Sequence, residues 1–256
     1  MNELDFTPVK QPLYWVGADG KQHATGKVAI CNGNHQLGIA SEDYVIMDHK
    51  AILNKAISML DSYGFEGVQR RGGQAYHVTG GGAHVWYEAS NKQLAKEVRV
   101  GDMVGMRIML NLPHTGTDSM SGNGGLLQFK CTNGAVSLAP GGFNFHLKHY
   151  GKKNAAAFYD LELRLPQLIE NAMDQFPNQI LAMQELAGKR LAESVIKEAL
   201  ESVSLRHAEE WRNRMTEPTA LEVLDIISEH QTHKSKSNWF YHRNQQQKVL
   251  EIVRRG

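Results

Sequence analysis

Two segments of the chain combine cationic side chains with aromatic ones: HLKHYGKK at 146–153 and HKSKSNWFYHRNQQQK at 233–248. A third basic spot, Arg70 and Arg71, precedes two glycines. Lysine and arginine bind phosphates and aromatic rings stack on exposed bases, so this combination is typical of surfaces that bind single-stranded nucleic acid. We expect contacts from Arg70, Arg71, Lys148, Tyr150, Lys152, Lys153, Trp239, Tyr241 and Arg243. The alternative is an ordinary solvated surface, with Trp239 packed as the anchor of a terminal helix.

Three further residues, His114, Asp118 and Cys131, are of types that carry acid–base or nucleophilic chemistry. Histidine titrates near neutral pH and is the usual general acid or base. Catalytic groups are recognised by their spatial geometry, and no familiar spacing links these three. The simpler interpretation is that His114 and Asp118 belong to a polar loop and that Cys131 is a buried thiol. An enzyme whose site lies on the loop 114–125 is therefore an alternative that requires the three side chains to converge.

The sequence gives little support to a metal or a cofactor. His146 with His149, and His230 with His233, form two H-x-x-H pairs. A metal site needs three or four convergent ligands, and neither pair has a cysteine or carboxylate cluster beside it. The nucleotide-binding, nucleophile-elbow and zinc-protease motifs are absent from the sequence. We predict no metal site and no cofactor.

Charge and cysteine content restrict the compartment and the partners. Lys and Arg number 28 and Asp and Glu 27, which excludes a uniformly basic surface but not a local basic patch. Two cysteines do not make a disulfide framework and favour a reducing compartment. No apolar run reaches the roughly 20 residues that span a bilayer, and the first residues do not resemble a signal peptide. We expect a cytoplasmic protein with no membrane segment.

Short β-prone runs separated by turns occupy the first 155 residues. Leu13–Val16 and Lys27–Cys31 flank Gly17–Gly20, whose Asp-Gly pair predicts a hairpin. Asp48 is placed to cap a helix that runs to Leu60. Further strands are expected over 75–79, 83–89, 104–110, 126–131, 135–138 and 143–147. The small polar residues 115–125 predict a loop.

Beyond residue 155 glycine becomes rare and the apolar spacing becomes helical. Helices are expected over 155–174, with a kink at Pro166, and over 178–188, 190–201, 219–229 and 245–253. The sequence therefore predicts an α+β protein. We expect residues 1–155 to form a core of mostly antiparallel sheet with one packed helix, and residues 156–256 to form a helical region that packs on that core.

The order of features over 104–154 resembles an uncharacterised phage/plasmid-like protein family, a group found in phages, prophages and plasmids. The resemblance rests on VGMRIMLNLPHTGTDSMSGNGGLLQFKCTNGAV followed by HLKHYGKKN. The counterparts of the family's motif residues are Asn111, His114, Gly116, Asp118, Ser119, Cys131, Asn133, His149 and Asn154. The resemblance implies an intracellular protein of a mobile element with a mixed core. The order of elements is also similar to that of phage single-strand annealing proteins, which is an analogy of fold.

These observations favour a nucleic-acid-binding protein, specifically a single-strand DNA annealing or recombination factor. Annealing needs a basic surface and exposed bases but no covalent chemistry. Such a protein is expected to form a homo-oligomer and to lose affinity steeply as salt rises. The alternative partner is a host protein, which a large exposed apolar patch would favour.

Overall fold

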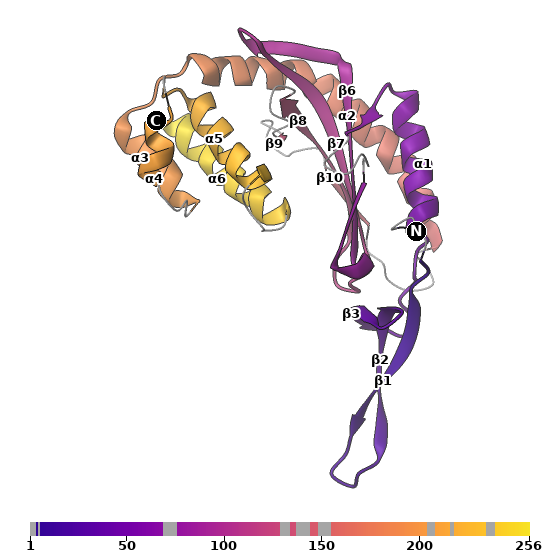
Figure 1. The fold of residues 1–256 in the computed structure, drawn as a ribbon. Coiled ribbons are helices and arrows are strands. Elements are labelled where there is room, and N and C mark those ends of the chain that lie inside the picture. Colours follow the sequence, from indigo (N-terminus) through magenta and orange to yellow (C-terminus); the bar gives the residue numbers. More distant parts are fainter. Residues whose placement is uncertain are drawn as a thin grey trace. The chain divides into compact units, whose positions relative to one another are not determined.

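The computed structural model describes residues 4, 6–68, 76–128, 134–136, 144–147, 155–203, 208–215, 218–233 and 239–256. Side chains are described for 4, 6–68, 76–126, 161–203, 211–215, 218–229 and 245–256. The described strands form two sheets, with one helix before the long strands and the other helices toward the C-terminus (Figure 1). The predicted α+β class is therefore confirmed.

The chain forms two compact units, each assembled from three stretches. The first contains residues 1–90, 108–123 and 144–170, and the second contains 91–107, 124–143 and 171–256. The change from strand to helix near residue 155 is observed, because α2 begins at Ala155. The division into domains 1–155 and 156–256 stays a prediction.

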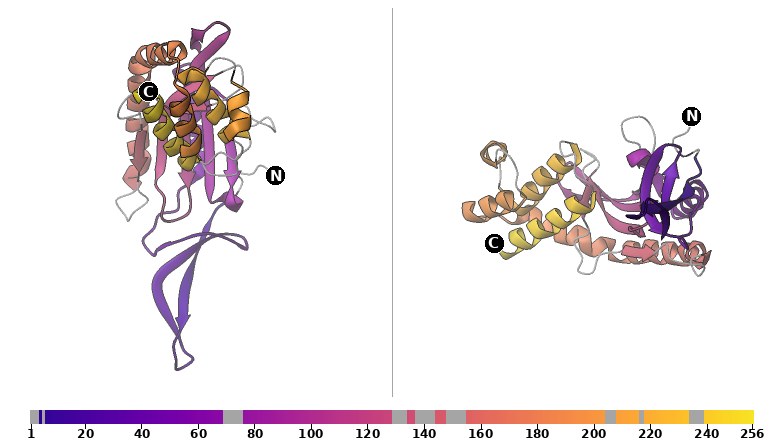
Figure 2. Two further views of the ribbon diagram at one scale, coloured as in Figure 1. Left: turned by 90° about the vertical axis from the view of Figure 1, so that its left-hand side faces the viewer. Right: turned by 90° about the horizontal axis from the view of Figure 1, so that it is seen from below.

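A three-stranded sheet opens the first unit. It has the order β1 (Val9–Val16), β2 (Gln22–Asn32), β3 (His35–Ser41), and both pairs are antiparallel. The predicted hairpin is confirmed, with Gly20 at φ 76° in the turn. The strands are longer than predicted, and β3 was not foreseen. Because β3 pairs only with Lys27–Asn32, the outer ends of β1 and β2 extend beyond it as a two-stranded ribbon (Figures 1 and 2).

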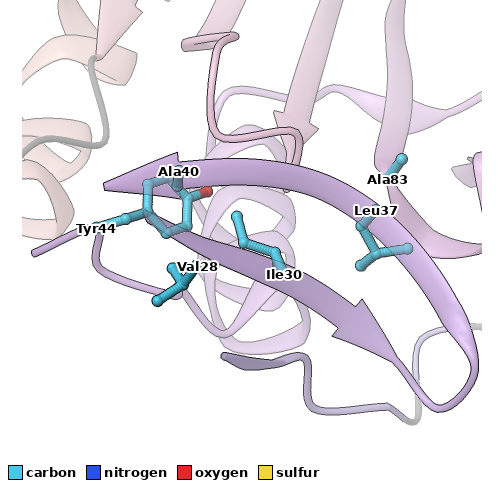
Figure 3. Close-up of a cluster of buried hydrophobic side chains, with 6 residues drawn as sticks. All are labelled: Val28, Ile30, Leu37, Ala40, Tyr44 and Ala83. Atoms are coloured by element: carbon cyan, nitrogen blue, oxygen red, sulfur yellow. The ribbon is translucent and has the colours of Figure 1, made fainter. Parts of the chain in front are cut away.

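The inner half of this sheet is anchored by a cluster of buried apolar side chains (Figure 3). Val28 and Ile30 of β2 lie with Leu37 and Ala40 of β3, and Tyr44 and Ala83 complete the cluster. Phe6 and Ile46 pack against it. These contacts fix the inner part of the hairpin to the rest of the first unit.

The second sheet has the order β10-β8-β7-β6-β4, with β5 added to β6 and β9 to β8. Its strands are β4 (Glu66–Gly67), β5 (Tyr76–Thr79), β6 (His84–Arg99), β7 (Asp102–Pro113), β8 (Met120–Gln128), β9 (Gly134–Val136) and β10 (Asn144–Leu147). A 3-10 turn, η1 (Gly80–Gly82), joins β5 to β6. The predicted strand at 104–110 is confirmed, and β7 is buried on both faces, because Arg107, Met109 and Asn111 are buried as well as Met106, Ile108 and Leu110.

Two sequence predictions about this sheet need correction. The predicted loop 115–125 ends earlier, because β8 begins at Met120. Its glycine-rich segment pairs with β10 and β9, and these ladders outweigh its low β propensity. Strands β6 and β7 also extend beyond the predicted ranges, to a turn at Val100–Gly101 in which Gly101 has φ 77°.

Three helices, His49–Ser62, Glu193–Ser202 and Ala220–His233, lie close to their predicted ranges, whereas the last helix begins at Trp239 rather than at 245 and the short helix Ala208–Asn213 was not predicted. Helix α1 (His49–Ser62) begins as predicted, with the Asp48 side chain accepting a hydrogen bond from the Ala51 backbone at 3.0 Å. Helix α2 (Ala155–Gly188) runs through Pro166 without the predicted break at 174–178, carrying buried side chains at helical spacing such as Leu161, Leu165 and Leu168. The others are α3 (Glu193–Ser202), α4 (Ala208–Asn213), α5 (Ala220–His233) and α6 (Trp239–Arg255). None of the described helices is both long enough and apolar enough to cross a bilayer.

Candidate functional site

Most of the residues predicted to contact nucleic acid lie outside the described part of the chain. These are Arg70, Arg71, Lys148, Tyr150, Lys152 and Lys153, together with the motif residues Cys131 and Asn133. Trp239, Tyr241 and Arg243 belong to the start of α6, and their side chains are outside the described ones. The roles proposed for all these residues stay predictions.

The outer half of the β1–β2 hairpin displays large apolar side chains to solvent. Tyr14 is 55% exposed, Trp15 54% and Val16 66%. Their cross-strand partners, Ala24, His23 and Gln22, lie in the part of β2 that β3 does not reach. Since adjacent side chains of a strand point to opposite faces, Tyr14 and Trp15 present one aromatic ring on each face of the ribbon.

The Trp15 ring is held in place by the turn. His23 stacks on it with ring centroids 4.6 Å apart and an interplanar angle of 22°. His23 Nε2 in turn lies 3.5 Å from Asp19 Oδ1. Gly17 makes room for this arrangement, because a Cβ there would lie 2.7 Å from Asp19 Oδ1 and 2.9 Å from His23 Nε2. One face of the indole therefore rests on the imidazole.

The same hairpin carries an excess of positive charge. Residues 9–32 contain Lys10, Lys21 and Lys27 against a single acidic residue, Asp19, which gives three positive charges and one negative. All three lysines are exposed. The hairpin thus combines exposed aromatic rings with cations, the chemistry that the sequence analysis assigned to other segments.

The exposure of this hairpin was missed by the sequence analysis, although its strands were found. The available signal is the run Leu13–Val16, which places large apolar side chains on both faces of a strand. Such a strand is normally buried on both sides. Only the short reach of β3 shows that the outer half is exposed.

A cluster of polar side chains surrounds His84 at the start of β6. Its Nδ1 lies 3.2 Å from Oδ1 of Asn111 on β7, and its Nε2 lies 3.6 Å from Oδ2 of Asp118. The Thr115 hydroxyl donates to Asp118 Oδ2 at 3.0 Å, and the Asp118 backbone N–H donates to Thr115 Oγ1 at 3.1 Å. The structure therefore joins two predicted motif residues, Asn111 and Asp118, through a histidine that the sequence analysis had not selected.

His114, another motif residue, is a core residue. It is 1% exposed and stacks on His49, which is also buried at 5% exposure, with ring centroids 3.5 Å apart. Phe6 meets it edge-on at 6.3 Å, and its backbone N–H donates to the Ala83 carbonyl at 2.7 Å. The imidazole close to Asp118 is His84, so the predicted pairing of His114 with Asp118 is replaced by one with His84. Convergence with Cys131 lies outside the described residues.

Within the described residues, no group of three or more His, Cys, Asp and Glu side chains converges closely enough to hold a metal ion. Burial raises the pKa of Tyr44 in the hairpin anchor, and burial together with the charge of Asp61 raises the pKa of Tyr87 on β6 to about 12. Both phenols lie in the first unit and act as neutral packing groups near pH 7.

Comparison with known proteins gave no match to a protein-family model, to a curated protein or to a solved structure. The resemblance to the phage/plasmid-like family therefore stays a prediction.

Proposed function

We propose that this protein binds single-stranded nucleic acid through the outer half of the β1–β2 hairpin, as a single-strand annealing or recombination factor of a phage or mobile element. The observation that carries the proposal is the pair of neighbouring aromatic side chains, Tyr14 and Trp15, each more than half exposed on a basic hairpin. Contiguous exposed apolar surface, here Tyr14, Trp15 and Val16, is typical of binding sites.

Stacking explains why a single strand is favoured over a duplex. Each base stacked on an aromatic ring contributes about 1–3 kcal/mol, and every base offers a flat face. In a duplex both faces of a base are covered by its neighbours, whereas in a single strand they are free to stack on protein. Because His23 already covers one face of Trp15, a base would stack on the other face of the indole.

The lysines account for attraction to the backbone. Lys10 and Lys21 flank Tyr14 and Trp15 in the sequence, and Lys27 is exposed on the neighbouring strand β2. Each phosphate neutralised by a protein cation contributes about −0.7 to the slope of log affinity against log salt for single strands. Three such contacts predict a slope of about −2 from the hairpin, and Arg70, Arg71, Lys148, Lys152, Lys153 and Arg243 would make it steeper.

The expected homo-oligomer, the cytoplasmic location and the roles of Tyr150, Trp239 and Tyr241 belong to the same proposal. A homo-oligomer would place several hairpins along one strand and raise the overall affinity through multivalency.

The test is binding of a fluorescein-labelled oligo(dT) measured by anisotropy at low salt. Trp15→Ala is expected to weaken binding about 5- to 150-fold, the range that corresponds to one lost stacking contact. Val100→Ala is the matched control, because Val100 is 98% exposed at the β6–β7 turn and its removal also deletes an exposed apolar side chain. Equal affinity of the Trp15→Ala variant and the wild type would refute this site.

A host protein is the second candidate partner. The observation in its favour is that Val9, at 49% exposure, and Ile39, at 43%, add apolar surface to the same three-stranded sheet. A wild-type protein that binds no oligonucleotide at low salt would favour this candidate over nucleic acid.

A further inference from the structure

The outer half of the β1–β2 hairpin is a ribbon one layer thick that carries an aromatic ring on each face (Figures 1 and 2). We propose that this ribbon binds a forked substrate, in which two unpaired strands leave one duplex and each strand stacks on one face. The inference rests on the proposed binding of single strands by the hairpin, and it names the substrate class of that site.

The register of the two strands assigns the side chains to the two faces. Over Tyr14–Val16 the pairing is regular, and the partners in β2 are Ala24, His23 and Gln22 in that order. Side chains alternate along a strand and directly opposite residues share a face, so Trp15 lies with His23 on one face and Tyr14 with Val16 on the other. Because β3 pairs only with the inner half of β2, it covers neither face of the ribbon.

The thickness of the ribbon limits what can stack on the two rings at once. Sheets that pack face to face are about 10 Å apart, so the side chains of one sheet reach about 5 Å from its backbone on either side. Two bases stacked on Tyr14 and Trp15 are therefore separated by about 10 Å or more. Neighbouring bases of one strand are only about 3.4 Å apart, and paired bases are joined by hydrogen bonds of about 3 Å. The two bases can thus be neither paired with each other nor consecutive in one stack.

Hydrogen bonds hold the outer half of the ribbon in shape at both of its ends. At the turn, the Gly20 N–H donates to the Gly17 carbonyl and the Gly17 N–H donates to the Lys21 carbonyl, each at 2.9 Å. At the other end, the Thr25 hydroxyl donates to the Leu13 carbonyl at 2.8 Å. The ribbon therefore has a fixed shape before any strand binds, as an element that keeps two strands apart requires.

A fork fits this arrangement better than one continuous strand. A single strand must bend round the turn to reach both rings, whereas two strands that diverge from a duplex each follow one face. Val16, which is 66% exposed, lies next to the turn, where an apolar side chain can pack as a wedge against the last base pair. The excess of positive charge on the hairpin attracts the phosphates of both strands.

The test compares two fluorescein-labelled DNAs by anisotropy at low salt. Both contain the same duplex and the same two oligo(dT) arms, which leave one end of the duplex in the fork and opposite ends in the control DNA. The wild type is expected to bind the fork about 5- to 150-fold more tightly, the range that corresponds to one additional base stacked at the same time. Because the arms and the charges are equal in number, the preference measures simultaneous binding of both arms.

Variants of Tyr14 separate the contributions of the two faces. Tyr14→Ala should bind both DNAs equally well, because only one face still carries a ring. Tyr14→Phe should keep the preference for the fork, because it keeps the ring. Val100→Ala, which removes an exposed apolar side chain from the β6–β7 turn, should keep the preference as well.

Two results would overturn the inference: equal affinity of the wild type for the two DNAs, or a preference for the fork that Tyr14→Ala retains. In either case, binding of oligo(dT) that Trp15→Ala weakens would leave the proposed function intact. A wild type that binds neither DNA would overturn the proposed function and this inference together.

Discussion

The two halves of the β1–β2 hairpin have similar apolar side chains and opposite surroundings. In the inner half, Val28 and Ile30 are 5% and 0% exposed, whereas in the outer half Trp15 and Val16 are more than half exposed. Pairing with β3 and the packing of the anchor cluster account for the difference, since the pairing ends at Lys27 and the cluster at Val28. The inner half is needed for stability, and the outer half is free to bind a partner.

Substitutions in the two halves of the hairpin should differ most in their effect on the free energy of unfolding. Ile30→Ala should lower the free energy of unfolding by about 2–5 kcal/mol, because it opens a cavity in the anchor cluster. Trp15→Ala should change it by less than about 1 kcal/mol, because the ring has little to lose on a solvent-exposed ribbon. Urea unfolding of both variants provides the measurement. An equal loss in the two variants would mean that the outer half is also packed in solution.

Alkaline pH should lower the stability of the first unit, which contains the buried phenols of Tyr44 and Tyr87. The pKa of Tyr87 is about 12 in the folded chain against 10.0 for an ordinary tyrosine, so the folded state keeps a proton that the unfolded chain loses. The stabilisation is complete below pH 10 and disappears as the pH rises from 10 to 12, by at most about 3 kcal/mol. Unfolding experiments at pH 9 and 11.5 should show this loss, and Tyr87→Phe should reduce it. A stability that is flat over this range in the wild type would contradict the burial of these phenols.

The smallest effect is expected from single charges on the outer half. Lys21→Ala should reduce the magnitude of the salt slope of oligonucleotide binding by about 0.7 and lower affinity only a few-fold at low salt. Anisotropy titrations between 50 and 300 mM salt would measure both quantities. Lys55→Ala, on α1 in an ion pair with Glu162, is the control that should leave the slope unchanged. A slope that Lys21→Ala does not alter would remove that lysine from the interface.

Local signals in the sequence predicted much of the fold. The Asp19-Gly20 turn located the first hairpin, Asp48 located the start of α1, and the apolar run at 104–110 located β7. Each of these features depends on residues that are close in sequence. The continuous α2 was missed because Pro177, a local break signal, lies in the predicted break at 174–178, and the apolar stripe overrides it.

The candidate sites were harder to predict because they depend on contacts between distant residues. His84 lies 27 residues from Asn111 and 34 from Asp118, and no spacing rule connects them. His114 looked like an acid–base group in the sequence, but its stacking on His49 makes it part of the core. The exposure of Trp15 depends on where β3 ends, which no residue near Trp15 encodes.

The most direct test of the central claim is the intrinsic tryptophan fluorescence of the protein during titration with unlabelled oligo(dT). Bases that stack on an indole quench its emission, so the wild type should lose fluorescence in a saturable way. The Trp15→Phe variant, which keeps an aromatic ring and the other three tryptophans, should still bind but lose the share of the quenching that comes from Trp15, leaving only the quenching of Trp239. Quenching of the same size in Trp15→Phe and wild type would show that the bases stack elsewhere and would contradict the account.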